Sequence, residues 1–123
     1  MQQSLFDSQP TQCHYLDLAD GDVTYYPNWI APDIASQYQK TLVDELPWRQ
    51  DTIKMFGKLV KIPRLQSWHG ESHCLYKYSD LTLHPLPWTP TLARLKHCCE
   101  RQTGALFNSA LANWYRDGQD SMG

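Results

Sequence analysis

A phenylalanine inside a basic segment is the first feature of the sequence that suggests chemistry. Phe56 stands next to Gly57, at the point where two short β-type runs meet. The cations around it are Lys54, Lys58, Lys61 and Arg64. An exposed aromatic ring among cations is typical of a wedge that enters a base stack while the cations hold phosphates. The alternative is a core phenylalanine on a strand whose lysines face water.

Planar side chains are concentrated just downstream of this segment. The group consists of Trp68, His69, Tyr76 and Tyr78. Such a cluster can hold a base that has been turned out of its duplex, because each ring offers a stacking surface. The same residues can also form an aromatic core, so the pattern by itself leaves both interpretations open.

The distribution of charge favours a polyanionic partner for the middle of the chain. The 123 residues carry a formal net charge of −2. Residues 1–48 contain one lysine against seven acidic residues, whereas residues 49–101 contain nine basic against four acidic residues. Local basic charge is what phosphate binding requires, whatever the balance of the whole chain. The alternative is a set of scattered, solvated lysines.

Composition argues against several other classes of protein. The chain is 41% hydrophobic and 12% aromatic, which argues against disorder. No apolar run approaches the roughly 20 residues that a membrane helix needs, and residues 1–10 lack a signal-peptide pattern. The four cysteines form no C-x-x-C pair, which favours a reduced protein. We therefore expect no membrane partner and no secretion, with a cytoplasmic location in a bacterium or a nuclear one in a eukaryote.

Strand-type runs surround the candidate residues. They are expected at residues 23–29, on both sides of Phe56-Gly57 within residues 51–64, at residues 74–78 and, as a buried strand, at residues 107–115. Residues 1–22 are polar and acidic without a sustained period. We expect them to form a loose arm, followed by one domain over residues 23–123.

Two helices complete the expected order of elements. The first opens at Pro32 and ends before Pro47, with apolar residues at every fourth position. The second has Thr89 as its N-cap, Pro90 at its first position and Gly104 at its end. Strands and helices in this order predict an α+β fold.

Five short stretches share a further property. They are Phe56-Gly57-Lys58, Pro63-Arg64-Leu65-Gln66, Tyr76-Lys77-Tyr78-Ser79, Pro87-Trp88-Thr89-Pro90, and Phe107-Asn108 through Asn113-Trp114-Tyr115-Arg116-Asp117-Gly118. Together they resemble the AlkB family of iron(II)- and 2-oxoglutarate-dependent nucleic-acid dealkylases, and most of all the vertebrate homologue 2 type, which acts on double-stranded DNA. The resemblance runs without gaps from about Met55 to Gly123, and it is weak before that.

The resemblance implies a role for each matched residue in the handling of DNA. Phe56 corresponds to the finger residue that fills the gap left by a flipped base. Arg64 corresponds to a residue that assists at the opened base pair or at a nearby phosphate. The full set implied to contact substrate DNA is Phe56, Gly57, Lys58, Arg64, Trp68, His69, Tyr76, Lys77 and Tyr78.

The resemblance also implies contacts with the cofactors. Asn113 and Tyr115 correspond to the pair that hydrogen-bonds 2-oxoglutarate, and an amide and a phenol can both address a carboxylate. The family usually has arginine between them, where this chain has Trp114. On a strand this side chain faces away from its neighbours, so the cofactor contacts need not change.

The family's Fe(II) is held by two histidines and a carboxylate. Because the H-x-D motif is expected just after Gly123, we expect neither metal ligands nor catalytic residues within the chain.

The function implied by the resemblance is oxidative repair of DNA. An alkylated base such as N1-methyladenine or N3-methylcytosine would be flipped and its methyl group hydroxylated, although the 123 residues alone are expected to be inactive. The implied fold is the N-terminal part of a double-stranded β-helix, or jelly roll, with two supporting helices and a β-hairpin lid. Because an incomplete jelly roll leaves sheet edges unpaired, self-association is also expected. Two alternatives remain open: a non-catalytic DNA-binding remnant, and a structural or protein-interaction domain.

Overall fold

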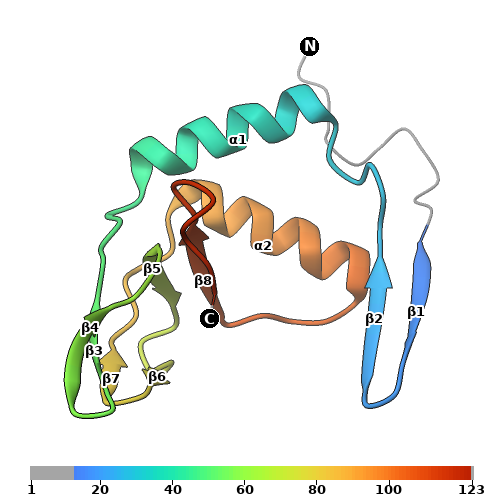
Figure 1. Cartoon of the computed structure of the whole chain (residues 1–123). Coiled ribbons are helices and arrows are strands. Elements are labelled where there is room, and N and C mark those ends of the chain that lie inside the picture. Colours follow the sequence, from blue (N-terminus) through green and yellow to red (C-terminus); the bar gives the residue numbers. More distant parts are fainter. Residues whose placement is uncertain (1–12, 123) are drawn as a thin grey trace. The chain divides into compact units, whose positions relative to one another are not determined.

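The computed structural model describes residues 13–122 and divides into two compact units, with the boundary after Thr41 (Figure 1). In the first unit, β1 (His14–Leu18) and β2 (Gly21–Tyr25) form an antiparallel hairpin. The helix α1 (Pro32–Glu45) starts in this unit, and its last residues belong to the second.

The β1–β2 hairpin corrects one sequence-based prediction. The prediction of a loose arm over residues 1–22 is wrong for residues 14–22, because these residues form β1, the turn after it and the start of β2. Leu16 pairs with Val23 and His14 with Tyr25, whose rings stack at 6.4 Å. Such cross-strand pairs stabilise a hairpin even where the composition is acidic. Residues 1–12 lie outside the described part of the chain.

The second unit contains three antiparallel strand pairs and one complete helix (Figure 1). The pairs are β3 (Thr52–Met55) with β4 (Lys58–Lys61), β6 (Tyr76–Tyr78) with β7 (Leu81–Leu83), and β5 (Leu65–Gly70) with β8 (Ser109–Trp114). The helix α2 (Pro90–Thr103) lies between β7 and β8 in the sequence. The predicted hairpin around Phe56-Gly57 is confirmed.

The predicted ends of α2 are confirmed in detail. The Thr89 side chain accepts a hydrogen bond from the amide of Leu92 at 3.2 Å, which satisfies one of the free donors at the helix start. Gly104 ends the helix in the left-handed region at φ 76°, and its amide donates to the carbonyl of Glu100. Leu92 is the buried residue of this helix.

The central pair β5–β8 is less evident from the sequence. The segment Leu65–Gly70 lacks β-branched residues, yet it forms a strand because it is paired on both sides. Its register with β8 runs from Leu65 opposite Trp114 to Gly70 opposite Ser109, and isolated bridges join it to Arg49 and Leu86. The predicted buried strand at residues 107–115 is shorter, and all of β8 is half-buried.

The core of the second unit is small. Its buried hydrophobic residues are Leu46, Ile53, Ile62, Leu83 and Leu92. The α+β class, the two helices and the hairpin agree with the sequence prediction, whereas residues 13–122 form small two-stranded sheets and no closed barrel. Within the same residues, no helix is long and apolar enough to cross a membrane.

Candidate nucleic-acid interface and cofactor-binding face

The tip of the β3–β4 hairpin presents an aromatic ring to solvent. The side chain of Phe56 is 98% exposed, so the alternative of a core phenylalanine is wrong. Phe56 and Gly57 have φ angles of 51° and 77°, and together they form the two-residue turn between Met55 and Lys58. Positive φ at both central positions is the geometry of a type I′ turn, which suits Gly and Asn but strains a bulky residue. The hairpin therefore exposes an apolar ring at a conformational cost.

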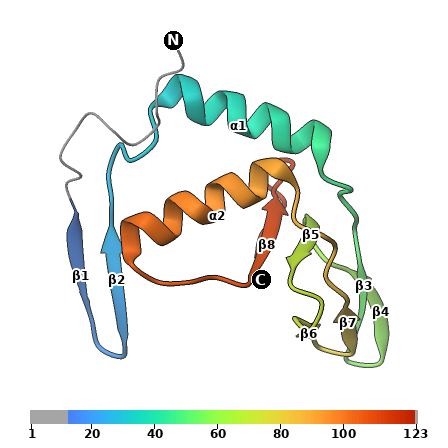
Figure 2. The ribbon, with the colours of Figure 1, turned by 180° about the vertical axis from the view of Figure 1, so that it is seen from behind.

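The hairpin carries cations and is tied to a second hairpin. Lys54, Lys58 and Lys61 are exposed around the tip. The amide of Lys54 donates to the carboxylate of Asp80 at 3.1 Å, and the hydroxyl of Ser79 donates to the carbonyl of Lys54 at 3.3 Å. Both partners lie in the turn between β6 and β7, which Figure 2 shows beside the β3–β4 hairpin. These bonds brace the base of the exposed tip.

Two aromatic residues of β6 face the start of β5. The ring of Tyr76 lies 5.2 Å from that of Trp68, and the guanidinium of Arg64 lies 5.5 Å from the ring centroid of Tyr78. The indole of Trp68 donates to the carbonyl of Cys74 at 2.8 Å, which fixes its orientation. The structure therefore brings together four of the residues that the sequence groups as DNA contacts. Lys77 lies between the two tyrosines and is exposed.

His69 does not belong to this cluster. It follows Trp68 on β5, so its side chain emerges on the opposite face of the strand, and it is 1% exposed. Its Nδ1 donates to the carbonyl of Pro87 at 2.8 Å, and its Nε2 is hydrogen-bonded to the hydroxyl of Ser67 at 2.7 Å. A ring that is buried and bonded at both nitrogens cannot stack on a base. We therefore remove His69 from the set of candidate DNA contacts.

Polar side chains continue the face that carries Trp68. Gln66 and Trp68 alternate with the back-facing residues of β5, and Asn113 lies directly opposite Gln66 on β8. Together, Arg64, Gln66, Trp68 and Asn113 form what is called the polar face below. Its buried polar atoms without a partner among the described residues are Nε and Nη2 of Arg64, Oε1 of Gln66 and Oδ1 of Asn113. Buried polar groups normally have partners, so this concentration marks a place where a ligand can bind.

An acidic residue outside the strands orients Gln66. Asp51 is 3% exposed, and its Oδ2 accepts from Nε2 of Gln66 at 2.8 Å. Its other oxygen pairs with the guanidinium of Arg49 at 2.5 Å. Arg49 also forms the backbone bridge to Gln66, with N···O distances of 2.9 and 3.1 Å in the two directions. The backbone and the side chain of Gln66 are therefore both fixed from the same segment.

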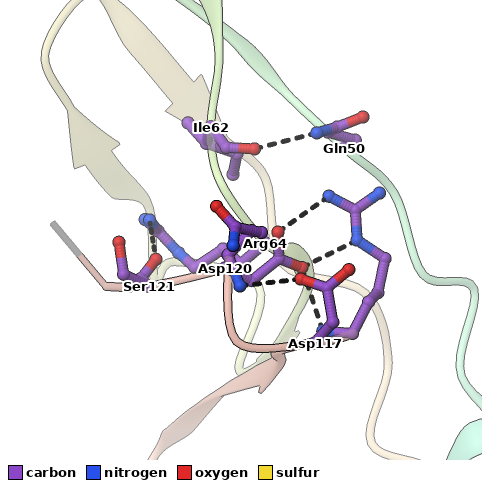
Figure 3. Close-up of polar contacts among 8 residues, drawn as sticks. Gln50, Ile62, Arg64, Asp117, Asp120 and Ser121 are labelled. Carbon is purple, nitrogen blue, oxygen red and sulfur yellow. Dashed lines mark hydrogen bonds and ion pairs between the residues drawn. The ribbon is translucent and has the colours of Figure 1, made fainter.

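Arg64 connects this face to the last described segment. It is 1% exposed, and its Nη1 donates to the carbonyl of Met122 at 3.0 Å. Figure 3 shows the second bond of Nη1, to the carbonyl of Ser121 at 3.5 Å. The amide of Ser121 donates to the carbonyl of Pro63 at 2.8 Å. The segment after the turn is thus held at the start of β5.

The turn that precedes this segment is closed by a two-point ion pair. The guanidinium of Arg116 donates to both carboxylate oxygens of Asp120, at 2.7 and 3.1 Å. Hydrogen bonds from the side chain and the backbone of Arg116 lower the pKa of Asp120. The amide of Gln119 donates to Asp117 at 2.8 Å, and Figure 3 shows Asp117 next to Asp120. These bonds stabilise the turn through contacts within residues 116–120.

Asn113 and Tyr115 have the side chains that a dicarboxylate would need. The NH2 group of Asn113 and the hydroxyl of Tyr115 can donate to carboxylate oxygens, and Tyr115, just beyond β8, is 44% exposed. The buried Oδ1 of Asn113, which has no partner among the described residues, is an acceptor and would need a donor instead. Trp114 faces the other side of the strand, where its ring meets that of Trp48 edge-on at 5.6 Å. The tryptophan between the two residues therefore leaves the polar face unobstructed. Among residues 13–122, no three His, Cys, Asp or Glu side chains are placed to hold a metal ion.

The sequence places these features in a known class. Residues 22–123 match the family model of the 2OG-Fe(II) oxygenase superfamily, and the chain belongs to this family of Fe(II)- and 2-oxoglutarate-dependent oxygenases. Its relatives include the bovine DNA oxidative demethylase ALKBH2, 42% identical over 71 residues that cover 58% of this chain and 26% of that protein. The human alpha-ketoglutarate-dependent dioxygenase alkB homolog 3 is 38% identical over 101 residues, which cover 81% of this chain and 35% of that protein.

These relatives confirm the resemblance to AlkB-type dioxygenases. The chain spans about a quarter to a third of the length of the curated relatives it matches. The fold of the family is a jelly roll, whereas residues 13–122 of this chain form small antiparallel sheets and no closed barrel.

Two residues of the site have no role in the sequence-based prediction. Gln66 stands within one of the matched stretches, but nothing in its type or spacing indicates an unpartnered oxygen. Asp51 is an isolated acid in a basic region, and its burial depends on contacts with Arg49 and Gln66. Only the folded chain shows that these residues meet.

Proposed function

We propose that this chain supplies the nucleotide-recognition part and the first 2-oxoglutarate contacts of an oxygenase that removes methyl groups from alkylated DNA bases, of the N1-methyladenine and N3-methylcytosine type. The observation that carries the proposal is the fully exposed, conformationally strained Phe56 at a lysine-flanked hairpin tip. A protein does not retain such a residue for stability, so the strain points to a function.

The hairpin would open the duplex. Lys54, Lys58 and Lys61 would bind phosphates, and the ring of Phe56 would occupy the space that a flipped base leaves in the stack. A base taken out of the stack needs a second surface to stack on. Trp68, Tyr76 and Tyr78 can provide this surface.

The cofactor side of the site is carried by β8 and the residue that follows it. Asn113 and Tyr115 would bind and orient 2-oxoglutarate through hydrogen bonds to its oxygens, because their side chains include the amide and phenol donors that carboxylates accept. The cofactor, when bound with Fe(II), supplies the oxidative chemistry of the family. Within this chain the contribution is therefore binding and orientation.

The test compares two substitutions of exposed apolar residues. Phe56→Asn removes the ring but suits the left-handed turn, so it should raise the free energy of unfolding by about 1 kcal/mol. The same change should weaken binding to a short duplex with a central N1-methyladenine about tenfold, because one stacking contact is lost. Fluorescence anisotropy at low salt measures the binding, and chemical denaturation measures the stability.

Leu106→Asn is the matched control. Leu106 is 90% exposed in the loop between α2 and β8 and, unlike Phe56, is not flanked by lysines in the sequence. The free energy of unfolding and the DNA affinity of the Leu106→Asn variant should both match those of the wild type. If the full chain binds no duplex at low salt, the proposed function is wrong. If Phe56→Asn binds as tightly as the wild type, the wedge is wrong.

A further inference from the structure

We propose that Gln66 is a specificity-determining residue, whose Oε1 accepts a hydrogen bond from the exocyclic amino group of the flipped base. This inference rests on the proposed function and refines it. It assigns to one residue the preference for bases with an amino group over bases with a carbonyl oxygen at the same place.

The orientation of the Gln66 amide follows from its partners. A carboxylate paired with an arginine accepts hydrogen bonds and does not donate them. Asp51 forms such a pair with Arg49, and the contact of 2.8 Å from Gln66 must therefore come from the NH2 group. The amide cannot turn over without losing this bond. Its oxygen is consequently fixed as an acceptor, and it is buried without a partner among the described residues.

The position of this oxygen suits the edge of a stacked base. Trp68 lies two residues further along the same face of β5 and meets Tyr76 at 5.2 Å. Arg64 lies two residues earlier and carries two unpartnered donor nitrogens. A base that stacks on the aromatic side would thus meet an acceptor from Gln66 and donors from Arg64. Adenine presents an amino donor next to a ring-nitrogen acceptor, and cytosine presents an amino donor, whereas thymine has a carbonyl oxygen in its place.

The energetic consequence is a penalty for the wrong base. A carbonyl oxygen placed against the fixed oxygen of Gln66 leaves two acceptors facing each other without a proton. One lost or unsatisfied buried hydrogen bond corresponds to a change in affinity of about tenfold. The full chain should therefore bind an oligonucleotide with a central N1-methyladenine about tenfold more tightly than one with N3-methylthymine.

Two substitutions test the assignment by different routes. Gln66→Met keeps the shape of the side chain and removes the acceptor, so the ratio of the two affinities should fall to about one. Asp51→Asn offers the glutamine a partner that can also donate. The Gln66 amide can then turn over and present its NH2 group to the base. This variant should reduce the preference for N1-methyladenine or reverse it in favour of N3-methylthymine, which loss of structure alone would not do.

The controls separate this inference from the proposed function. Gln39→Met changes an exposed glutamine of α1 in the same way and should retain the wild-type ratio. Circular dichroism of each variant checks that it is folded. Absence of binding to every oligonucleotide would overturn the proposed function. Binding without discrimination in the wild type, or discrimination that persists in both variants, would overturn the role of Gln66 and leave the proposed function standing.

Discussion

The β3–β4 hairpin and the β5–β8 pair differ in the solvent exposure of their side chains. The hairpin holds an apolar ring in water, with Phe56 98% exposed at a turn of positive φ. The strand pair holds charged and polar groups away from water, with Arg64 and Gln66 each 1% exposed. In both regions the side chains are in environments that oppose their chemistry. A residue kept at such a cost is better explained by a ligand than by the stability of the chain.

The two regions differ in how firmly they are held. The hairpin is fixed by its own four-residue register and by the bonds of the Lys54 backbone to Ser79 and Asp80. The strand pair is fixed along six residues, and the backbone N–H and C=O of Gln66 are both hydrogen-bonded to Arg49. A tip that can adapt suits insertion into a duplex, whereas a rigid face suits selection between similar bases.

The largest expected effect concerns the glycines of the two regions. A Cβ at Gly70 would lie 2.6 Å from the carbonyl oxygen of Asn108 and 2.8 Å from the Cα of Ser109, which are backbone atoms of the neighbouring segment. Gly70→Ala should therefore separate β5 from β8 and destabilise the fold by about 3 kcal/mol. At Gly57 a Cβ would meet nothing within 4 Å, although φ is 77°. Gly57→Ala should cost only about 1 kcal/mol.

Urea denaturation of both variants measures this difference. Amide hydrogen exchange locates it, because Gly70→Ala should expose the amides of β5 and β8, whereas Gly57→Ala should affect the hairpin alone. Equal losses of stability in the two variants would show that the strand pair is no more rigid than the hairpin.

The second prediction concerns the cost of the buried charge. Arg64→Met keeps a long side chain but removes a guanidinium with two unpartnered nitrogens. Replacement of a buried charge by an apolar residue is often neutral or stabilising. We expect the free energy of unfolding to change by less than about 1 kcal/mol, although the bonds to Ser121 and Met122 are lost. Affinity for the methylated duplex should fall at least about tenfold, because a charged hydrogen-bond donor is removed.

Arg94→Met is the control for this substitution. Arg94 is exposed on α2 and lies outside the polar face, so its replacement should leave both the free energy of unfolding and the affinity for the duplex at the wild-type values. A large loss of stability in Arg64→Met, combined with unchanged binding, would make Arg64 a structural residue and would remove it from the proposed site.

The sequence predicts the hairpin better than the strand pair, and the reason is physical. The turn at Phe56-Gly57 and the ends of α2 depend on local chemistry, namely a glycine in the left-handed region, an N-cap threonine and a proline at the first helical position. Such signals are contained in a few adjacent residues. For the same reason, the position of both helices follows from the sequence.

The strand β5 and the role of its residues depend on contacts between distant segments. Gln66 meets Asp51 across 15 residues and lies opposite Asn113 across the whole of α2. The choice of face for His69 also follows from register, which a local pattern of aromatic residues does not reveal. The resemblance to a known family identifies Arg64, Asn113 and Tyr115 as candidates, but it does not show which of their atoms are free.

A smaller effect is expected at the sheet edges. The edge strand β4 carries Lys58 and Lys61, and lysines on an edge oppose pairing with another chain. The strand β8 carries no charged residue, and among residues 13–122 it pairs only with β5. We therefore expect the 123-residue chain to self-associate through β8. Sedimentation velocity over a range of concentrations checks this, and a monomer at every concentration would contradict it.

The smallest expected effect concerns the helices of the second unit. The hydroxyl of Thr91 donates to Glu45 at 2.6 Å, which joins the last residue of α1 to the first turn of α2. This bond is the main cause that lowers the pKa of Glu45 from its ordinary value of 4.5. Because the pKa is lowered in the folded state, the bond stabilises the fold in full above pH 4.5. The contribution then disappears as the pH falls through the lowered pKa.

Thr91→Val should therefore cost about 1 kcal/mol at neutral pH and much less in acid. Urea denaturation at neutral pH and at a pH below the lowered pKa of Glu45 measures the difference, because the contribution of the bond is lost once the glutamate is protonated. Thr103→Val is the matched control, because the hydroxyl of Thr103 donates to the carbonyl of Cys99, which does not titrate. Its effect should be equal at the two pH values. If Thr91→Val also shows no pH dependence, the bond between Thr91 and Glu45 does not contribute to the acid sensitivity of the second unit.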